Sequence, residues 1–282
     1  MVGIEKEYWK KKDVRDIGKS DIIDFKRDCE GKFTWKEKTL KNQMDHFKVF
    51  MNYLRGDLEL IGSVPQFPEI DVPIPQIPWL QCDDQISLYN LVADQDKPII
   101  GFLMLHGCRP GEARAMKCND VNLEMESITC HATFSKNVYC ERRKGRKSRP
   151  YVIAIHPEIM GYVAEKVRTS LPEAFLFTNP RTGGYYSQEA IFRVWENVRT
   201  AAGISGITLY GASRHSFVSQ LINLNISSSK VSQLTGHSSP RMIDQKYAHH
   251  DLDSLRTDLA LMSLKKRETV TRLSLRKKGD EK

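Results

Sequence analysis

Four side chains with phosphate-binding or nucleophilic chemistry lie beside turn-like stretches of this sequence: Arg109 in HGCRPGE, Arg214 in YGASRHSF, His237 in LTGHSS and Tyr247 in KYAHH. Singly, each has a structural explanation, such as a helix-start ion pair, a helix end or core packing. Together they suit the cleavage of a phosphodiester by a protein hydroxyl. Guanidinium groups hold the non-bridging oxygens and stabilise the charge of the transition state, while a phenol attacks phosphorus and forms a phosphotyrosine.

The same reaction needs a proton donor for the departing alkoxide, and a lysine or histidine can supply the proton. The segment 136–149 (KNVYCERRKGRKSR) has seven basic side chains against one glutamate, and residues 263–282 have eight against three acids. Charge concentrated in two short segments of a chain with net charge +8 favours a polyanionic partner without identifying it. The expected contacts to that partner in the first segment are Lys136, Arg142, Arg143, Arg146, Lys147 and Arg149.

The cysteines and the apolar runs exclude several other kinds of site. The six cysteines form no C-x-x-C pair, so no zinc site is expected, and free thiols suit a reducing cytoplasm. No apolar run approaches membrane-spanning length and the first 25 residues are charged throughout, so neither a membrane partner nor a signal peptide is expected. We therefore expect a cytoplasmic protein. The sequence has no P-loop and no acidic metal cluster, which agrees with a phosphodiester cleavage that needs no metal and no cofactor.

A proline-rich stretch divides the chain. The five prolines of VPQFPEIDVPIPQIP (64–78) favour an extended linker. Residues 1–63 before it predict a small helical domain, because TLKNQMDHFKVFMNYL (39–54) spaces its apolar side chains by three and four positions. A second helix is expected near 20–28.

Residues 79–262 predict a mainly α domain with a small antiparallel β-sheet, an α+β fold, and 263–282 form a basic tail. Strands are expected at 127–134 and 151–155, with the basic segment as the hairpin loop between them. Gly107 is expected to end a helix and Pro110 to begin the next one. Helices are expected at about 86–92, 97–107, 110–117, 157–168, 187–202, 213–224, 228–235 and 251–262.

The order of the motifs resembles that of a known family. RPGEARAMKCNDV, the lysine-rich hairpin, ASRHSF, LTGHSS and KYAH follow one another as they do in the tyrosine recombinases, the phage integrase family, and Arg214 and His237 are 23 residues apart, as is usual there. The resemblance covers about 79–262, and 1–78 are similar to the helical core-binding domain. It implies a site-specific recombinase or integrase of the Xer-like or mobile-element kind, which cuts and rejoins DNA through a 3′-phosphotyrosyl link.

Position by position, the resemblance assigns roles to these side chains. Arg109 and Arg214 resemble the two phosphate-binding arginines, Tyr247 the nucleophile, and His237 a later phosphate contact. Lys144 resembles the hairpin lysine that acts as general acid.

Two further assignments carry an alternative. Lys147 is the other candidate for the general acid, because the register of the loop is not fixed. Glu112 resembles an acidic residue one turn into the helix, which orients Arg109 or caps the helix.

Three features depart from the family pattern. Gly211 stands where the family usually has a histidine, three residues before the second arginine. A glycine cannot transfer a proton, so either Tyr210 or His215 substitutes in part, or the step is slower. A histidine restored at 211 is expected to raise the cleavage rate unless crowding offsets the gain. The interval from His237 to Tyr247 is one residue longer than usual, and the N-terminal domain is shorter than typical.

The segment after the tyrosine bears on assembly. DLDSLRTDLALMSLKK (251–266) has Leu252, Leu255, Leu259 and Met262 at helical spacing. The resemblance implies that this segment docks on a neighbouring subunit in a homotetramer, and packing within its own chain is the alternative. Two other functions remain open: a type IB topoisomerase-like nicking-closing enzyme, and a DNA-binding remnant of a mobile-element integrase, for which Gly211 is the best support.

Overall fold

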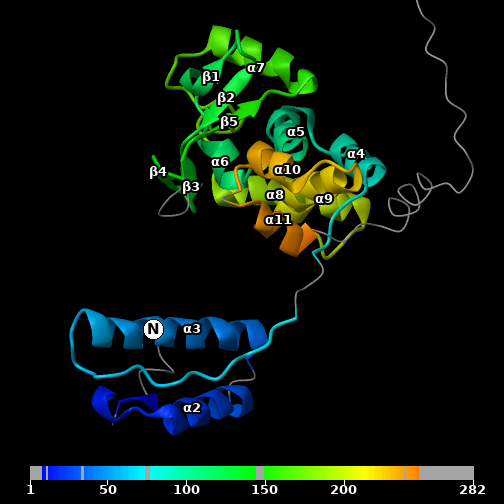
Figure 1. The fold of residues 1–282 in the computed structure, drawn as a ribbon. Helices are drawn as coiled ribbons and strands as arrows, with labels where there is room; N and C mark the ends of the chain where they lie inside the picture. The colour runs from blue at the N-terminus through cyan, green and yellow to red at the C-terminus, as the bar shows by residue number, and fades with distance from the viewer. Residues whose placement is uncertain are drawn as a thin grey trace, which may run out of the picture. The chain divides into compact units, whose positions relative to one another are not determined.

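The protein is described here by a computed structural model, which covers residues 8–10, 12–32, 35–73, 77–143, 149–237 and 239–247. The chain divides into two compact units, Met1–Pro75 and Gln76–Lys282 (Figure 1). The predicted helix at 251–262, the basic tail and three of the expected loop cations, Lys144, Arg146 and Lys147, lie outside the described residues.

Two helices form the core of the first unit. α2 (Lys19–Lys32) and α3 (Glu37–Gly56) follow a short 3-10 turn, η1 (Val14–Asp16). The spacing of three and four in the sequence becomes the buried face of α3, which carries Leu40, Met44, Phe47, Met51 and Leu54. This face packs on Ile22, Phe25 and Cys29 of α2. Both expected helices of the N-terminal segment are therefore confirmed.

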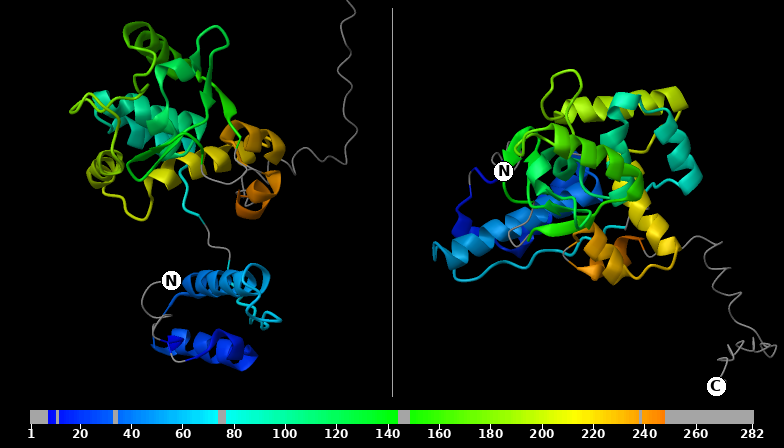
Figure 2. Two further views of the ribbon diagram at one scale, coloured as in Figure 1. Left: turned by 90° about the vertical axis from the view of Figure 1, so that its left-hand side faces the viewer. Right: turned by 90° about the horizontal axis from the view of Figure 1, so that it is seen from above.

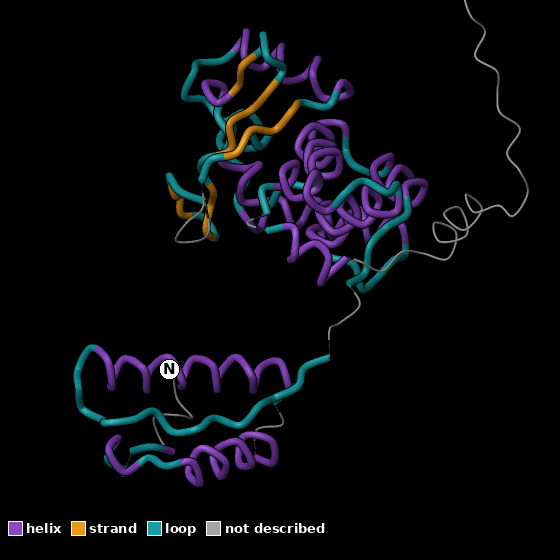
Figure 3. The backbone as a smooth tube through the Cα atoms, viewed as in Figure 1, coloured by secondary structure: helices purple, strands orange, loops and turns teal. Residues whose placement is uncertain are grey.

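Residues 64–73 of the proline-rich segment form neither helix nor strand, and part of this stretch belongs to the packing of the first unit (Figure 3). Val64, Phe67 and Ile70 lie against the core of α2 and α3. The ring centroid of Phe67 is 5.6 Å from that of Phe47, and Lys41 Nζ donates a hydrogen bond to the carbonyl oxygen of Ile70 at 3.0 Å. Residues 64–70 thus form a strap over the helices of this unit.

The second unit is built around α5 (Lys97–His106), a helix whose apolar side chains Ile99, Ile100, Phe102 and Leu103 are fully buried. A 3-10 turn, η2 (Asp94–Asp96), leads into it. No helix among the described residues is long and apolar enough to cross a membrane. The other helices of the unit are α4 (Cys82–Asn90), α6 (Pro110–Ala115), α7 (Pro157–Thr169), α8 (Gln188–Ala202), α9 (Ser216–Asn223), α10 (Ser228–Thr235) and α11 (Pro240–Tyr247), with a 3-10 turn η3 (Cys118–Asp120) and a π-helical turn η4 (Gly211–His215).

Two small antiparallel sheets complete this unit (Figure 3). β1 (Val121–Asn122), β2 (Ser127–Cys130) and β5 (Tyr151–Ala154) form one sheet, in which Ser127 pairs with Ala154 and Cys130 with Tyr151. β3 (Thr133–Ser135) and β4 (Val138–Cys140) form a separate hairpin. The mainly α fold with small antiparallel sheets is as predicted.

The single strand predicted at 127–134 is wrong in one respect, because it divides into β2 and β3. Phe134 leaves the main sheet and stacks on Tyr185, with ring centroids 4.4 Å apart, in a satellite cluster that includes Ala115 and Ala132. The basic segment therefore begins with a second hairpin, and only its later part lies between the paired strands β2 and β5.

Candidate active site

Arg214 lies at the centre of the site, fully buried on the π-helical turn. Its Nη1 donates to the carbonyl oxygens of Gly107, after α5, and Thr235, at the end of α10, each at 3.0 Å. The last carbonyls of a helix have no partner within it and carry negative partial charge, so a guanidinium is a favourable partner for them. The ends of two helices thus fix the orientation of this arginine before any ligand binds.

Gly107 permits this arrangement at the end of α5. Its φ of 58° is left-handed, as the sequence predicts for a helix-ending glycine. A Cβ at this position would lie 2.4 Å from Cδ1 of Phe217. The carbonyl that holds Arg214 therefore depends on a residue without a side chain.

His237 lies against Arg214 across a short turn. Its Nε2 and Nδ1 are 3.0 Å and 3.2 Å from Nη2 of Arg214. Since a guanidinium only donates, one of these ring nitrogens accepts. Thr235 Oγ1 is a further partner, 2.5 Å from Nδ1. α10 ends at Gly236 with φ 62°, and this left-handed residue turns the next side chain back onto the arginine.

Arg109 and Glu112 form the second part of the site at the start of α6. Glu112 Oε2 accepts from the backbone N–H of Arg109 at 3.0 Å, and Oε1 accepts from its Nη1 at 2.9 Å. The sequence left two roles open for Glu112, and the geometry supports both, because the carboxylate caps the helix and also orients Arg109. The Arg109 side chain keeps 32% exposure, so it is within reach of a ligand.

Glu112 stays charged although it has no solvent exposure. Burial acts to raise the pKa of its carboxyl group, but the guanidinium groups of Arg143 and Arg109 outweigh burial and lower that pKa. Tyr151 adds a weak contact, with its hydroxyl 3.4 Å from Oε2. The carboxylate is thus a fixed negative charge that holds two arginines.

Arg143 is placed differently from the expectation for a DNA contact. Its side chain is buried, with Nε donating to Glu112 Oε1 at 2.9 Å. The guanidinium carbon lies 4.1 Å from the centroid of the Tyr151 ring. The exposed basic side chains of the described part of this segment are Lys136, Arg142 and Arg149.

Tyr247 enters the site from the end of α11. The ring is 5% exposed and packs in a cluster with Val218, Ile222, Val231 and Ile243. Burial raises the pKa of its phenol and nearby Tyr210 raises it further, while Arg214 and Arg109 act in the opposite direction. The extra residue between His237 and Tyr247 does not separate them, since their ring centroids are 6.5 Å apart.

His215 is the direct partner of the phenol, for its Nδ1 forms a short hydrogen bond with the Tyr247 hydroxyl. The donor in this bond follows from the tautomer assigned to the ring, and with the imidazole proton on Nε2 the phenol is the donor. Tyr210 packs edge-on against the same imidazole, with centroids 4.7 Å apart. Both residues that the sequence offered as substitutes for a histidine at 211 therefore lie at the nucleophile.

The π-helical turn explains why Gly211 is not at the site. In η4 the N–H of Ser216 bonds the carbonyl oxygen of Gly211, five residues back instead of four. A Cβ on Gly211 would point at Ile207 Cγ1, Pro78 O and Thr208 Oγ1, at 3.1, 3.3 and 3.4 Å, and none of these belongs to the site. The extra residue in the turn places Tyr210 beside His215, five positions later.

Arg114 is a structural residue that the motif alone did not reveal. It is buried one turn after Arg109, and its guanidinium carbon lies 5.0 Å from the centroid of the Phe134 ring. Nε donates to the Tyr186 carbonyl oxygen at 2.6 Å, and Nη2 donates to the Lys136 carbonyl oxygen at 3.0 Å. The short helix α6 thus carries one arginine to the site and uses another to hold the β3–β4 hairpin. Arg109 and Arg114 are five positions apart in RPGEAR, and this spacing places them on different faces of the helix.

The site therefore combines two oriented guanidinium groups, an imidazole at each side of a buried phenol, and exposed cations on a nearby hairpin. Such a set can bind a phosphate diester, supply a nucleophilic oxygen and accept its proton. Among the described residues no three His, Cys, Asp or Glu side chains are grouped as metal ligands. Figure 2 shows α10 and α11 together at one end of the unit, with α10 against β5, which is how the late motifs meet the earlier ones.

Comparison with known proteins identifies a family and relatives with similar sequences. The sequence model described as the phage integrase family matches residues 79–253. The "Putative integrase/recombinase y4rF" of Sinorhizobium fredii is 24% identical over 209 residues, covering 69% of this chain but only 47% of that protein. Tyrosine recombinase XerC of Bacillus pumilus is 24% identical over 237 residues, covering 78% of this chain and 72% of the relative.

Solved structures share the fold. The Tn1549 transposon integrase, solved in complex with a circular intermediate DNA, has a TM-score of 0.68 at 17% identity, with 89% of this chain and 87% of that chain covered. The XerH site-specific recombinase bound to its difH substrate has a TM-score of 0.60 at 16% identity, with 88% and 72% covered.

Proposed function

The chain belongs to the phage integrase family, and on that premise we propose that it is a site-specific DNA recombinase in which Tyr247 is the nucleophile. The observation that carries this proposal is the hydrogen bond between the Tyr247 hydroxyl and Nδ1 of His215, the residue next in sequence to the buried Arg214. A phenol held against a proton acceptor and beside a guanidinium suits attack on a phosphate better than it suits a packing role.

The reaction is a pair of phosphoryl transfers. The Tyr247 oxygen forms a bond to the scissile phosphorus, the bond from phosphorus to the 5′ oxygen breaks, and the 3′ end stays attached to the protein. The phenol proton passes to His215, and a proton from the loop lysine, Lys144 or Lys147, goes to the departing 5′ oxygen. A 5′-hydroxyl from a partner duplex then reverses these steps and rejoins the strand.

The two arginines stabilise the charge on the non-bridging oxygens. Arg109 is partly exposed, whereas Arg214 is fully buried and its Nη2 lies against the ring of His237. A phosphate therefore meets Arg109 first and reaches Arg214 when the His237 ring moves. His237 then contacts the phosphate from the Arg214 side, the role that its position in the motif predicts.

The assignment of the nucleophile is tested with a nicked suicide duplex taken from the DNA that flanks the gene. Tyr247→Phe should abolish the covalent adduct on a denaturing gel and leave duplex binding intact, because only the attacking oxygen is lost. Peptide mapping of the wild-type adduct should give the peptide that contains Tyr247. An adduct on Tyr185, Tyr186 or Tyr210 would show that another residue attacks.

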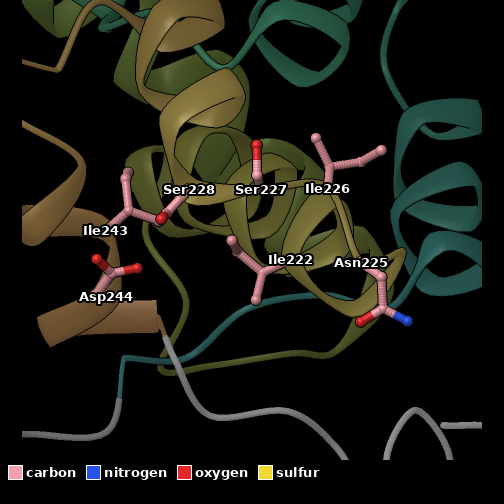
Figure 4. Close-up of a pocket in the computed structure, with 7 residues that line it drawn as sticks. All are labelled: Ile222, Asn225, Ile226, Ser227, Ser228, Ile243 and Asp244. Atoms are coloured by element: carbon pink, nitrogen blue, oxygen red, sulfur yellow. The ribbon is translucent and has the colours of Figure 1, made fainter.

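The binding partner is double-stranded DNA, contacted by the exposed Lys136, Arg142 and Arg149 together with the basic tail. Strand exchange between two sites requires several subunits, and we assign their contact to the segment after the nucleophile. A cavity of about 230 Å³ lies between the end of α9, the start of α10 and α11 (Figure 4). Ile222, Ile226 and Ile243 form its apolar side, which suits the leucines of 251–262 from a neighbouring copy, and Asn225, Ser227, Ser228 and Asp244 complete the lining.

The assembly is tested by mass photometry on paired sites. The wild-type protein should give a species with four copies, and Ile226→Asp, at the half-buried isoleucine of the lining, should leave only one or two copies on DNA. A four-copy species from this variant would contradict the assignment of the cavity.

The alternative of an inactive remnant loses its main support. Gly211 suggested a missing catalytic group, but the π-helical turn brings Tyr210 and His215 to the phenol instead. Exchange between two labelled duplexes distinguishes a recombinase from a nicking-closing enzyme, which would relax supercoiled DNA without joining separate molecules.

A further inference from the structure

The π-helical turn η4 carries Arg214 and His215, and Tyr210 directly precedes it. Backbone hydrogen bonds that span five residues are rare, and such turns occur mostly at functional sites. The contacts that hold η4 in this form therefore determine where the side chains of the turn lie.

Gln85 of α4 has a buried amide that binds this turn. The residue is only 9% exposed, and its Nε2 donates to the carbonyl oxygen of Ala212 at 2.8 Å. Its Oε1 accepts from Nε2 of Gln220, on α9, at 3.1 Å. A buried amide is costly unless it is hydrogen-bonded, and here both of its polar atoms have a partner.

The residue before Gln81 holds the same turn through Ser216. The backbone N–H of Leu80 donates to Ser216 Oγ at 2.9 Å, and this hydroxyl donates to the carbonyl oxygen of Gly211 at 2.9 Å. Gln220 also donates to the carbonyl oxygen of Leu80, at 2.9 Å. Two successive carbonyl oxygens of η4, at positions 211 and 212, thus accept from buried side chains.

These contacts favour the π-helical form over an ordinary helical turn. In an α-helix the Gly211 carbonyl would accept from the N–H of His215, whereas in η4 it accepts from the N–H of Ser216. A change between the two forms would move the carbonyls of Gly211 and Ala212. The amide of Gln85 would then be a buried donor without its acceptor, and the cost of such a donor opposes the change.

We propose that Gln85 is a positioning residue, which keeps η4 in its π-helical form so that His215 stays against the Tyr247 hydroxyl. This inference rests on the proposed function. Gln85 is not itself a catalytic residue, because its amide binds Ala212 and Gln220 while the ring of His215 binds the phenol.

The experiment is a double-mutant cycle between Gln85 and His215, measured as single-turnover cleavage of the nicked duplex. Gln85→Met fills a similar volume but has no donor. It should slow cleavage by about 10²-fold, the scale for a reacting group that is misplaced by about 1 Å. Because this loss passes through His215, Gln85→Met combined with His215→Gln should be no slower than His215→Gln alone.

Gln81→Met is the matched control, because it makes the same change at an exposed position just before α4 and should cleave at the wild-type rate. Gln220→Met, at the half-buried partner of Gln85, repeats the cycle with less disturbance of the core and should give a smaller deficit. It takes the place of Gln85→Met if that variant does not fold. Effects that multiply in the double variants, or wild-type cleavage by Gln85→Met and Gln220→Met, would overturn the proposal.

A second measurement needs no DNA. The NMR resonance of the His215 Nδ1 nitrogen reports its hydrogen bond with Tyr247, so it should shift in Gln85→Met and stay in place in Gln81→Met. An unshifted resonance in Gln85→Met would show that η4 does not depend on Gln85. A wild-type protein that forms no adduct would count against the proposed function, while this spectrum would still test the link between Gln85 and η4.

Discussion

At the scale of single residues, the site consists of charges that the fold has already oriented. Arg214 is bound by two helix-end carbonyls, and Arg109 by a carboxylate that cannot reach solvent. Donors fixed before the reaction cost no reorganisation when charge develops on the phosphate, which is the basis of their catalytic value. The same burial makes the site sensitive to removal of any one partner.

Arg109→Ala and Arg214→Ala should each slow formation of the covalent adduct by about 10²-fold or more, the scale for the loss of one preorganised donor. Duplex affinity should change far less, because exposed cations elsewhere also bind phosphates. Single-turnover cleavage and a binding titration measure the two quantities. Arg168→Ala on α7, an exposed arginine of the same unit, is the control. Wild-type cleavage by either site variant would show that its arginine does not bind the scissile phosphate.

His215→Gln should slow cleavage at neutral pH by about 10²-fold, the scale of general-base catalysis. A glutamine can still bond the Tyr247 hydroxyl but cannot take its proton. Burial raises the pKa of that phenol, so the hydroxyl stays protonated at neutral pH without a base. The deficit should narrow as the pH increases, because hydroxide then removes the proton. A constant deficit across a pH–rate profile would assign His215 a structural role only.

The sequence was sufficient to predict which residues of the motifs lie together in the fold. Arg109, Arg214, His237 and Tyr247 come together as their order and spacing predict. The burial of Arg143 could not be predicted from the sequence, because a run of basic residues predicts exposed side chains. Only its packing against Tyr151 and Gly236 shows that this arginine is buried.

At the scale of elements, the π-helical turn is the feature that sequence periodicity misses. A reading at 3.6 residues per turn places position 211 on the same face as Arg214. The additional residue in η4 moves Tyr210 to the site and turns Gly211 toward Ile207 and the Pro78 carbonyl. The expectation that a histidine at 211 restores a catalytic group is therefore not supported by the geometry.

Gly211→His should lower stability and should not raise the cleavage rate. Its side chain would have to displace Ile207 and Pro78, and overpacking of this kind costs about 1–3 kcal/mol. Thermal unfolding should show a lower Tm, with the adduct assay unchanged or slower. Gly161→Ala on α7, where a Cβ has no neighbour within 4 Å, is the control and should be neutral or stabilising. Faster cleavage by Gly211→His would show that position 211 faces the phosphate after all.

Sequence periodicity also does not predict that the strand expected at 127–134 divides into two strands. Apolar alternation marks β-structure but not the partner of each strand. Long-range contacts decide that point: Phe134 packs on Tyr185, and Arg114 binds the Lys136 carbonyl. The helices were predicted more closely, because their amphipathic spacing and their capping residues act locally, as at Gly107 and Pro110.

At the scale of the whole molecule, the basic charge is unevenly placed. The net charge of the chain is +8, while 136–149 alone carry seven basic side chains against one acid and 263–282 eight against three. The remainder of the chain therefore has more acidic than basic side chains. Attraction to DNA is thus concentrated where the sequence predicts contact with the duplex, and the helical cores contribute little to it.

Deleting 263–282 should weaken duplex binding and make it less dependent on salt. Each phosphate contact releases counterions and contributes about −0.9 to the slope of log K against log salt. If five of the eight tail cations touch phosphates, the slope should become less steep by roughly 4–5. Titrations between 50 and 200 mM salt measure this slope.

Replacing the eight tail cations by glutamine is the control for chain length, and this variant should give the same slope as the deletion. Cleavage at saturating protein should persist, because every residue assigned to the site lies before the deleted segment. An unchanged slope in both variants would show that the tail does not touch DNA.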